Sequence, residues 1–358
     1  MITIKEALTK KEMKDYVMFS FELYKNNPYW IPPIIAEELE TFDKTKNPAL
    51  QTAEAHFYLA YKDNKIVGKI AAIINWEEVN LLGKRKARFG WFDAIDDVEV
   101  TKALLNKVEE LGRKHNMDHM EGPMGFSNLD KVGILSEGFD QMGNMITWYS
   151  LPYYITHFEQ LGFIKEKEYT ESDFSFNGIN PEPFQKASEL IKKRYELRSL
   201  NFTKTKDIMP YVDKMFDLFN ETYARLQSFV PINDIQKEYF KKKYIGFINP
   251  EFIKFIVDKN DNMIAFAIVM PGFAQALKKA NGKLFPFGFY HLLQARKHSK
   301  EVVFYLIGVL PEYQSKGITA IVFDEYYKVC QAKGIETCIR TPELEENHAI
   351  HNLWKHFN

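Results

Sequence analysis

The chain has 358 residues, of which 46% are apolar and 15% aromatic, and its formal net charge is −1. This length and apolar content are enough for two domains with cores of their own, and the near-neutral charge excludes the broad basic surface typical of nucleic-acid-binding proteins. No run of 18 apolar residues occurs, so no transmembrane helix is predicted.

Two further features predict a cytoplasmic protein. The first residues contain no apolar segment after a basic start, as a secretory signal would require. The two cysteines, Cys330 and Cys338, have no metal-ligand neighbours in sequence and suit a reducing compartment. We interpret both as small buried apolar residues, and we expect no metal site in the chain.

The first half of the chain predicts strands and helices in alternation. Apolar residues recur at helical spacing in some segments and alternate in others, with turn residues such as Asp63 and Asn64 between them. The expected strands are 2–5, 56–61, 66–74, 89–92, 117–120 and a strand or hairpin at 164–176, and the expected helices are 11–24, 34–42, 98–115 and 152–163.

A glycine- and proline-containing stretch at 177–183 reads as a link between two halves, followed by a connecting helix at 184–195. We therefore predict one domain at 1–176, a linker with its connecting helix at 177–194, and a second domain at 195–358. The second half begins in the same order as the first. Its expected elements are a strand at 195–202, helices at 208–226 and 235–244, and strands at 252–257 and 263–269.

Between residues 270 and 300 the second half carries an insertion. An apolar and aromatic block, 284–293, has basic residues on both sides. We interpret the insertion as a lid or packing element, and the alternative is that 284–293 contacts a membrane surface or a long acyl chain.

The stretch from Val303 to Ala320 carries the most specific chemistry. Val303–Ile307 reads as a buried strand that ends before Pro311. A polar loop follows, and a helical pattern begins at Ile318. The first amides of a helix lack intrahelical acceptors and lie at the positive end of its dipole, and Gly317 lets a ligand approach the backbone. A phosphate or pyrophosphate is the expected ligand.

These residues resemble the GNAT superfamily of acyl-CoA N-acyltransferases, whose strand and helix flank the pattern V-x-P-x-x-[QR]-x-x-G-x-[GA]. The chain matches it from Val309 to Thr319, with Thr319 at the position of the last Gly or Ala. The resemblance implies two tandem GNAT-like mixed sheets flanked by helices, an α/β (α+β) fold. It also implies acetyl-CoA or another acyl-CoA as substrate, with the pantetheine arm along the strand and the pyrophosphate on the loop. The residues implied to bind it are Ile307, Gly308, Val309, Gln314, Ser315, Lys316, Gly317, Ile318, Thr319 and Ala320.

A second segment, Asn347 to Trp354, resembles the family's N-x-A-x-x-x-L-Y helix and adds Asn347 to the implied cofactor residues. Trp354 stands where the family has a tyrosine that often protonates the thiolate. The first half has Asp93, Asp96 and Asp97 where the phosphate loop would lie, and carboxylates repel a pyrophosphate. We therefore expect coenzyme A in the second half only, and the sequence leaves open what completes that half's sheet.

The predicted reaction is transfer of an acyl group, most simply acetyl, to an amine of unidentified identity. Direct transfer of this kind requires positioning of the amine, proton removal and oxyanion stabilisation, with little covalent machinery. Tyr305 and Glu343 lie in suitable elements and are the catalytic candidates. Two alternatives stay open, namely a non-catalytic ligand-binding or scaffold protein that retains the fold, and a tandem aminoacyl or long-chain acyl transferase.

Overall fold

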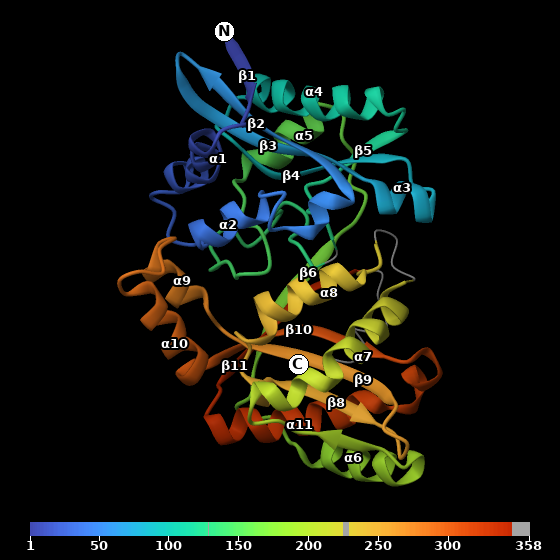
Figure 1. Cartoon of the computed structure of the whole chain (residues 1–358). Helices are drawn as coiled ribbons and strands as arrows, with labels where there is room; N and C mark the ends of the chain where they lie inside the picture. The colour runs from blue at the N-terminus through green and yellow to red at the C-terminus, as the bar shows by residue number, and fades with distance from the viewer. Residues whose placement is uncertain (128, 225–228, 346–358) are drawn as a thin grey trace. The chain divides into compact units, whose positions relative to one another are not determined.

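A computed structural model describes residues 1–127, 129–224 and 229–345 of the chain (Figure 1). The chain divides into two compact units, each formed by two segments. The first unit comprises Met1–Glu166 and Ala274–His291, and the second comprises Lys167–Phe273 and Leu292–Asn358. The prediction ended the first domain at residue 176, whereas the first segment of the first unit ends at Glu166. The prediction also made that domain continuous, whereas residues 274–291 of the insertion belong to the first unit.

The first unit is built on a five-stranded sheet in the order β1-β2-β3-β4-β5. Neighbours are antiparallel except β4 and β5, which are parallel. Asp63 and Asn64 form the β2–β3 turn with φ of 50° and 62°, as the predicted turn requires. The strands are β1 (Ile2–Glu6), β2 (Ala53–Lys62), β3 (Lys65–Asn75), β4 (Lys86–Ala94) and β5 (His119–Glu121).

Helices cover both faces of this sheet (Figure 1). Because side chains alternate along a strand, Ile70, Ala72 and Ile74 of β3 pack on one face and Ala71 and Ile73 on the other. The first face packs against α4 and α5, and the second against α1. The helices are α1 (Lys10–Leu23), α2 (Ile35–Thr41), α3 (Trp76–Leu82), α4 (Val98–Lys114) and α5 (Tyr153–Gln160), with a 3-10 helix at Pro48–Gln51.

The second unit repeats this order of elements around a six-stranded sheet, β6-β11-β10-β9-β8-β7. Only β10 and β11 are parallel neighbours. The strands are β6 (Tyr169–Ser175), β7 (Arg198–Leu200), β8 (Ile253–Val257), β9 (Met263–Pro271), β10 (Glu301–Val309) and β11 (Thr337–Leu344). The helices are α6 (Glu182–Tyr195), α7 (Thr205–Tyr223), α8 (Asp234–Phe240) and α11 (Ile318–Lys333), with short turns at Lys241–Ile245, Pro250–Phe252 and Pro311–Lys316.

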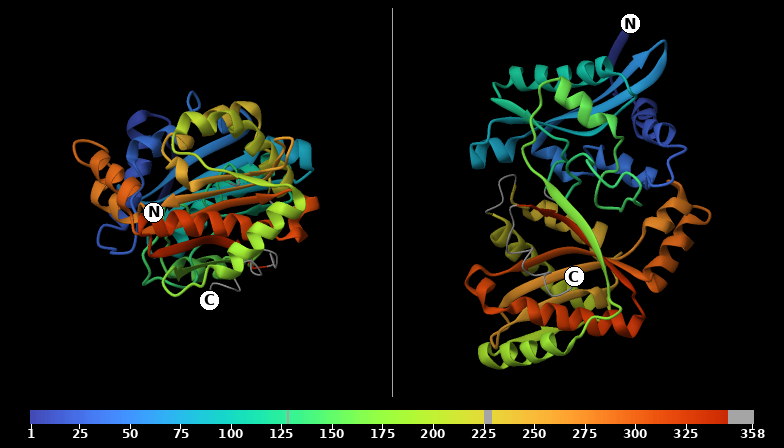
Figure 2. Two further views of the ribbon diagram at one scale, coloured as in Figure 1. Left: turned by 90° about the horizontal axis from the view of Figure 1, so that it is seen from below. Right: turned by 180° about the vertical axis from the view of Figure 1, so that it is seen from behind.

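Strand β6 corrects the predicted domain boundary. We expected residues 164–176 to close the first half, but β6 pairs antiparallel with β11 at the edge of the second sheet (Figure 2). Its Phe174 is buried in the core of the second unit. The segment that completes the second sheet therefore precedes that sheet's other strands in the chain, and the sequence had left its identity open.

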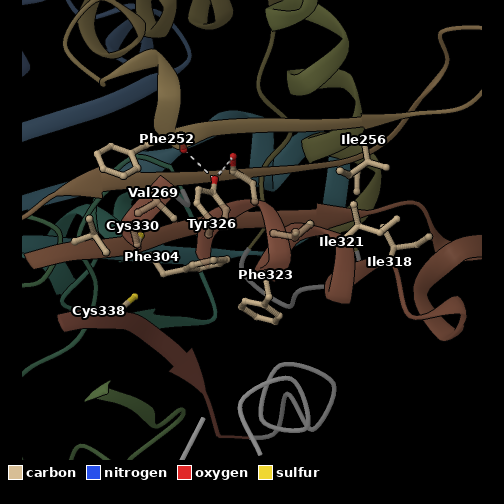
Figure 3. Packing of buried hydrophobic residues seen from close by; sticks show 14 of the residues in the cluster. Phe252, Ile256, Val269, Phe304, Ile318, Ile321, Phe323, Tyr326, Cys330 and Cys338 are labelled. Atoms are coloured by element: carbon tan, nitrogen blue, oxygen red, sulfur yellow. Dashed lines mark hydrogen bonds between the residues drawn. The ribbon is translucent and has the colours of Figure 1, made fainter. Parts of the chain in front are cut away.

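One hydrophobic core of the second unit lies between the sheet and α11 (Figure 3). Ile318, Ile321 and Val322 of α11 are at most 1% exposed. The hydroxyl of Tyr326 lies 2.9 Å from the carbonyl oxygen of Phe252 and 2.7 Å from that of Ala267, so this helix is fixed to the sheet by polar as well as apolar contacts. Both cysteines are free and buried here, as interpreted from the sequence.

The insertion forms two helices, α9 (Ala274–Ala280) and α10 (Gly288–His298), drawn in orange in Figure 1. None of the helices in the described part of the chain combines the length and apolar character that crossing a bilayer requires.

Candidate functional site

Strands β10 and β11 pair over their first halves only. Their parallel register runs from Glu301 opposite Thr337 to Phe304 opposite Arg340. Beyond Phe304, within the residues that the structure describes, no strand pairs with this side of β10. A bulge at Tyr305 also shifts the register of β10 against β9 at this point. Two parallel strands therefore separate in the middle of the sheet, and one long side of β10 is left as an inner edge.

The main-chain groups on this inner edge can be assigned from the pairing with β9. Leu310 donates its N–H to the carbonyl of Ile264 at 2.9 Å, and Gly308 lies opposite Phe266 in the same ladder. In an antiparallel ladder, alternate residues direct their amides toward the partner. The N–H and C=O groups of Ile307 and Val309 therefore point away from β9, toward the inner edge.

Two side chains confirm this direction. The hydroxyl of Tyr223, at the end of α7, donates to the carbonyl of Ile307 at 3.0 Å. The side-chain amide of Gln314 donates to the carbonyl of Val309 at 3.2 Å. With these carbonyls engaged, the inner edge presents mainly N–H donors, which suits an extended ligand that carries amide carbonyls.

The segment after β10 differs from the predicted loop. Pro311–Lys316 forms a 3-10 helix, and Gly317 adopts φ = 76° between it and α11. Proline at the first position favours this helical turn, and the positive φ explains why glycine follows it. The change from loop to helix leaves the start of α11 in the predicted place.

The N-terminus of α11 has no side-chain cap and no acidic residue in its first turn. The first amides of the helix therefore meet neither a capping oxygen nor a repelling carboxylate from their own turn. A Cβ at Gly317 would lie 2.9 Å from Cδ1 of Ile191, so the side chain of Ile191 packs against this glycine. The uncapped helix start fits a bound phosphate group, and Gly317 permits the left-handed backbone that precedes it.

Lys316 adds positive charge beside this helix end. Its ammonium lies 4.1 Å from the centroid of the Tyr313 ring and 5.2 Å from that of Tyr195. Such cation–π contacts hold the side chain against the 3-10 helix without neutralising its charge.

The remaining predicted cofactor residues differ in their surroundings. Ser315 is exposed and Thr319 is half-buried, so both lie at the surface around the helix start. Ile318 is 1% exposed and packs into the core, which leaves only its main chain for a ligand. Ala320 donates its N–H to the carbonyl of Gly317 at 2.9 Å, so this amide is used within the helix. Asn347 and Trp354 lie outside the described residues.

The two catalytic candidates lie where the strands separate. Tyr305 is the bulged residue of β10, next to the last residue paired with β11. Glu343 follows an irregularity in β11 and lies opposite Thr170 of β6. The fold thus brings residues 38 positions apart in sequence to the same part of the sheet, and both side chains are half-buried.

Sequence reasoning missed Tyr223. Its position at the end of a long helix carries no motif, and its contact with Ile307 depends on how α7 crosses the sheet. Burial raises the pKa of Tyr223 to about 12, so its hydroxyl is protonated at neutral pH and acts as a donor.

In the first sheet, the edge of β4 that corresponds to the inner edge of β10 is covered by the residues that follow β5. After β5, Met124 donates its N–H to the carbonyl of Phe89 in β4 at 2.7 Å, and a Cβ at Gly90 would lie only 2.2 Å from the carbonyl oxygen of Met124. The N-terminus of α4 is capped by Asp97, whose carboxylate accepts from the N–H of Glu99 at 3.0 Å. Among the described residues of the first unit, β4 therefore has no unpaired inner edge like that of β10, and α4 has no uncapped start like that of α11.

Metal-dependent and thiolate chemistry find no candidate residues in the part of the chain that the structure describes. The described residues include no group of three or more His, Cys, Asp or Glu side chains placed to hold a metal ion. Burial raises the pKa of the Cys330 thiol to about 12 and that of Cys338 well above its usual range, so neither is a thiolate nucleophile at neutral pH.

Comparison with known proteins gives relatives by sequence and by structure. No protein-family model matches the chain. Protein YghO of Escherichia coli is 27% identical over 326 residues, covering 89% of this chain and 81% of that protein. The bacterial ceramide synthase of Caulobacter vibrioides is 25% identical over 312 residues, covering 86% of this chain and 80% of that protein.

Two solved structures align along nearly the whole chain. A tandem GNAT protein from the clavulanic acid biosynthesis pathway gives a TM-score of 0.53 at 10% identity, covering 100% of this chain and 94% of that one. A GCN5-related N-acetyltransferase from Sphaerobacter thermophilus gives a TM-score of 0.50 at 9% identity, covering 98% and 91%. At these identities the likeness concerns the fold alone, and the chain has the tandem GNAT fold that its motif predicted.

Proposed function

We propose that this tandem GNAT-fold protein is an acyl-CoA-dependent N-acyltransferase whose second unit binds coenzyme A. The observation that carries the proposal is the inner edge of β10, which leads directly to the uncapped start of α11. An extended pantetheine arm would add to the edge through the N–H groups of Ile307 and Val309. The pyrophosphate would meet the amides that follow Gly317, with Lys316 nearby.

The bound thioester supplies an activated acyl group. The amine nitrogen attacks the thioester carbonyl carbon, the C–N bond forms, and the C–S bond breaks. The amine loses one proton and the departing thiolate takes one up. A main-chain N–H of β10 would stabilise the oxyanion, and we assign proton removal to Tyr305 or Glu343, directly or through water.

The acyl donor has two candidates. Acetyl-CoA is the simplest, but the likeness to a protein named bacterial ceramide synthase favours a longer chain. A ceramide is a fatty amide of a long-chain amino alcohol, so this relative points to a long-chain acyl-CoA as donor and an amino lipid as acceptor. A cytoplasmic location, where acyl-CoA is supplied and thiols stay reduced, belongs to the same proposal.

Calorimetric titration of the whole protein with acetyl-CoA, octanoyl-CoA and free coenzyme A tests the binding step. We expect micromolar affinity for at least one of them. The variant Ser315→Glu places a carboxylate beside the pyrophosphate site on an exposed residue, without straining the backbone. It should weaken binding at least about tenfold. The control Gln331→Glu makes the same charge change on an exposed residue at the other end of α11 and should leave affinity unchanged.

Absence of binding at millimolar ligand, or equal affinities in the two variants, would refute the coenzyme site. If binding holds, release of free thiol in the presence of a panel of short and long-chain amines tests the reaction. Binding without thiol release for any amine would favour the alternative, a ligand-binding protein that retains the fold.

A further inference from the structure

The segment 274–300 differs in charge from the rest of the chain. It contains no aspartate or glutamate and six lysines or arginines, whereas the whole chain has a formal charge of −1. The basic residues stand on both sides of an aromatic stretch, 285–290, which includes the first residues of α10. They are Lys278, Lys279, Lys283, Arg296, Lys297 and Lys300.

The aromatic stretch is exposed. Phe285, Phe287, Phe289 and Tyr290 are 77%, 70%, 52% and 57% accessible to solvent. The chain contains 29 phenylalanines, and in the described ranges only these three are among the exposed large apolar residues. Single exposed apolar residues are common on protein surfaces, but four aromatic side chains within six residues mark an interaction site.

The base of this segment is fixed to the first unit. The N–H of Ile35 donates to the carbonyl of Gly282 at 2.9 Å, and the ammonium of Lys278 donates to the carbonyl of Pro28. A Cβ at Gly282 would lie 2.6 Å from Cζ of Phe21, so helix α1 packs closely against the turn. The aromatic side chains of the turn after α9 and of the start of α10 are therefore presented to solvent by a segment with defined contacts at its base.

We propose that this segment docks the protein on the surface of an anionic lipid bilayer. Aromatic side chains favour the boundary between headgroups and acyl chains, and exposed lysines such as Lys279 and Lys283 are attracted to anionic headgroups. Helices α9 and α10 have 7 and 11 residues, too few to cross a bilayer, so the attachment is peripheral. The inference goes beyond acyl transfer and does not depend on it.

The arrangement of the basic and aromatic residues favours a lipid surface over a second copy of the chain or a nucleic acid strand. A second copy of the chain would bring two basic segments face to face, which is electrostatically unfavourable in a two-fold dimer. A single nucleic acid strand is bound by aromatic residues set among basic ones along a groove. Here the aromatic block is contiguous and the charges flank it, which matches a layered lipid–water interface.

Vesicle flotation of the full-length protein tests the proposal. We expect the protein to float with vesicles in which roughly a third of the lipid is phosphatidylglycerol and much less with pure phosphatidylcholine, with binding that weakens as salt rises. The variant Phe285→Ser/Phe287→Ser/Phe289→Ser/Tyr290→Ser should bind at least about tenfold more weakly. The variant Lys279→Glu/Lys283→Glu, which leaves the aromatic residues in place, should lose the preference for anionic vesicles.

The control Leu81→Ser/Ile164→Ser/Leu190→Ser/Ile235→Ser removes four apolar side chains that are 67%, 86%, 65% and 60% exposed elsewhere. It should bind vesicles like the wild type. Equal flotation of the aromatic variant and this control would overturn the proposal. So would a dimer in sedimentation analysis that the aromatic variant dissociates without any change in flotation, or binding to single-stranded RNA in the absence of vesicle binding.

Discussion

At the scale of single residues, the site contains one position that the sequence predicted for a different reason. The resemblance to the GNAT superfamily implied that Gly308 lies along the pantetheine arm. The structure adds a packing constraint, because a Cβ there would lie 2.3 Å from Cε1 of Phe266 and 2.9 Å from Oγ1 of Thr222. Tyr223 was not predicted, because no spacing rule relates the end of α7 to the carbonyl of Ile307.

Substitution Gly308→Ala tests the packing constraint. The added methyl group meets the ring of Phe266, which is fully buried and cannot withdraw into solvent. We expect the free energy of unfolding to fall by about 2–3 kcal/mol, measured by urea denaturation. Gly246→Ala is the matched control, since a Cβ there meets nothing within 4 Å, and it should change stability by less than about 0.5 kcal/mol. Equal effects of the two substitutions would show that Phe266 does not crowd Gly308.

At the scale of elements, local patterns predicted most helices and strands but not how they are joined. Alternation and helical spacing depend on neighbouring residues, so they can be recognised in the sequence without knowledge of the tertiary contacts. The 3-10 helix at Pro311–Lys316 was expected as a loop, since Pro, Ser and Gly are typical of both. The clamp between α6 and α11 involves residues 133 positions apart, Lys192 and Glu325, and no local pattern marks it.

This clamp should govern part of the acid stability of the second unit. Glu325 accepts from the ammonium of Lys192 at 2.7 Å and from the side-chain amide of Asn201 at 2.9 Å. Burial opposes ionisation, but the hydrogen bonds from Lys192 and Asn201 outweigh it and lower the pKa of Glu325 from 4.5 to about 2. The stabilisation is therefore complete above pH 4.5 and is lost as the pH falls toward 2.

The substitution Glu325→Gln should lower the free energy of unfolding by roughly 2–4 kcal/mol at pH 7. The difference from the wild type should shrink between pH 4.5 and pH 2, because only the wild type loses an ionised carboxylate there. Denaturant unfolding across this range measures it. Glu182→Gln removes the exposed ion pair with Lys186 on α6 and should change stability by less than about 0.5 kcal/mol. A pH-independent difference would indicate that the charge of Glu325 is not what stabilises the clamp.

At the scale of the whole molecule, the sequence predicted two halves with the same order of elements, and the structure has them. The predicted boundary between the halves differs from the structure, because the sequence of a strand does not determine which other strand it pairs with. Residues 169–175 read as the last strand of the first half by proximity alone. The insertion illustrates the same limit, since residues 274–291 belong to the first unit although they interrupt the second.

Phe174→Ala tests the assignment of β6 to the second unit. Phe174 is 8% exposed and belongs to the core that α11 covers, so the cavity should cost about 3–4 kcal/mol. Hydrogen exchange followed by mass spectrometry should then show faster exchange in β10 and β11, with β2 and β3 unchanged. Phe158→Ala is the matched control, because this residue of α5 is 6% exposed in the core of the first unit. It should accelerate exchange in β3 and β4 instead. Loss of protection in the first sheet on substitution of Phe174 would place the boundary where the sequence had it, and would leave β11 without its edge strand.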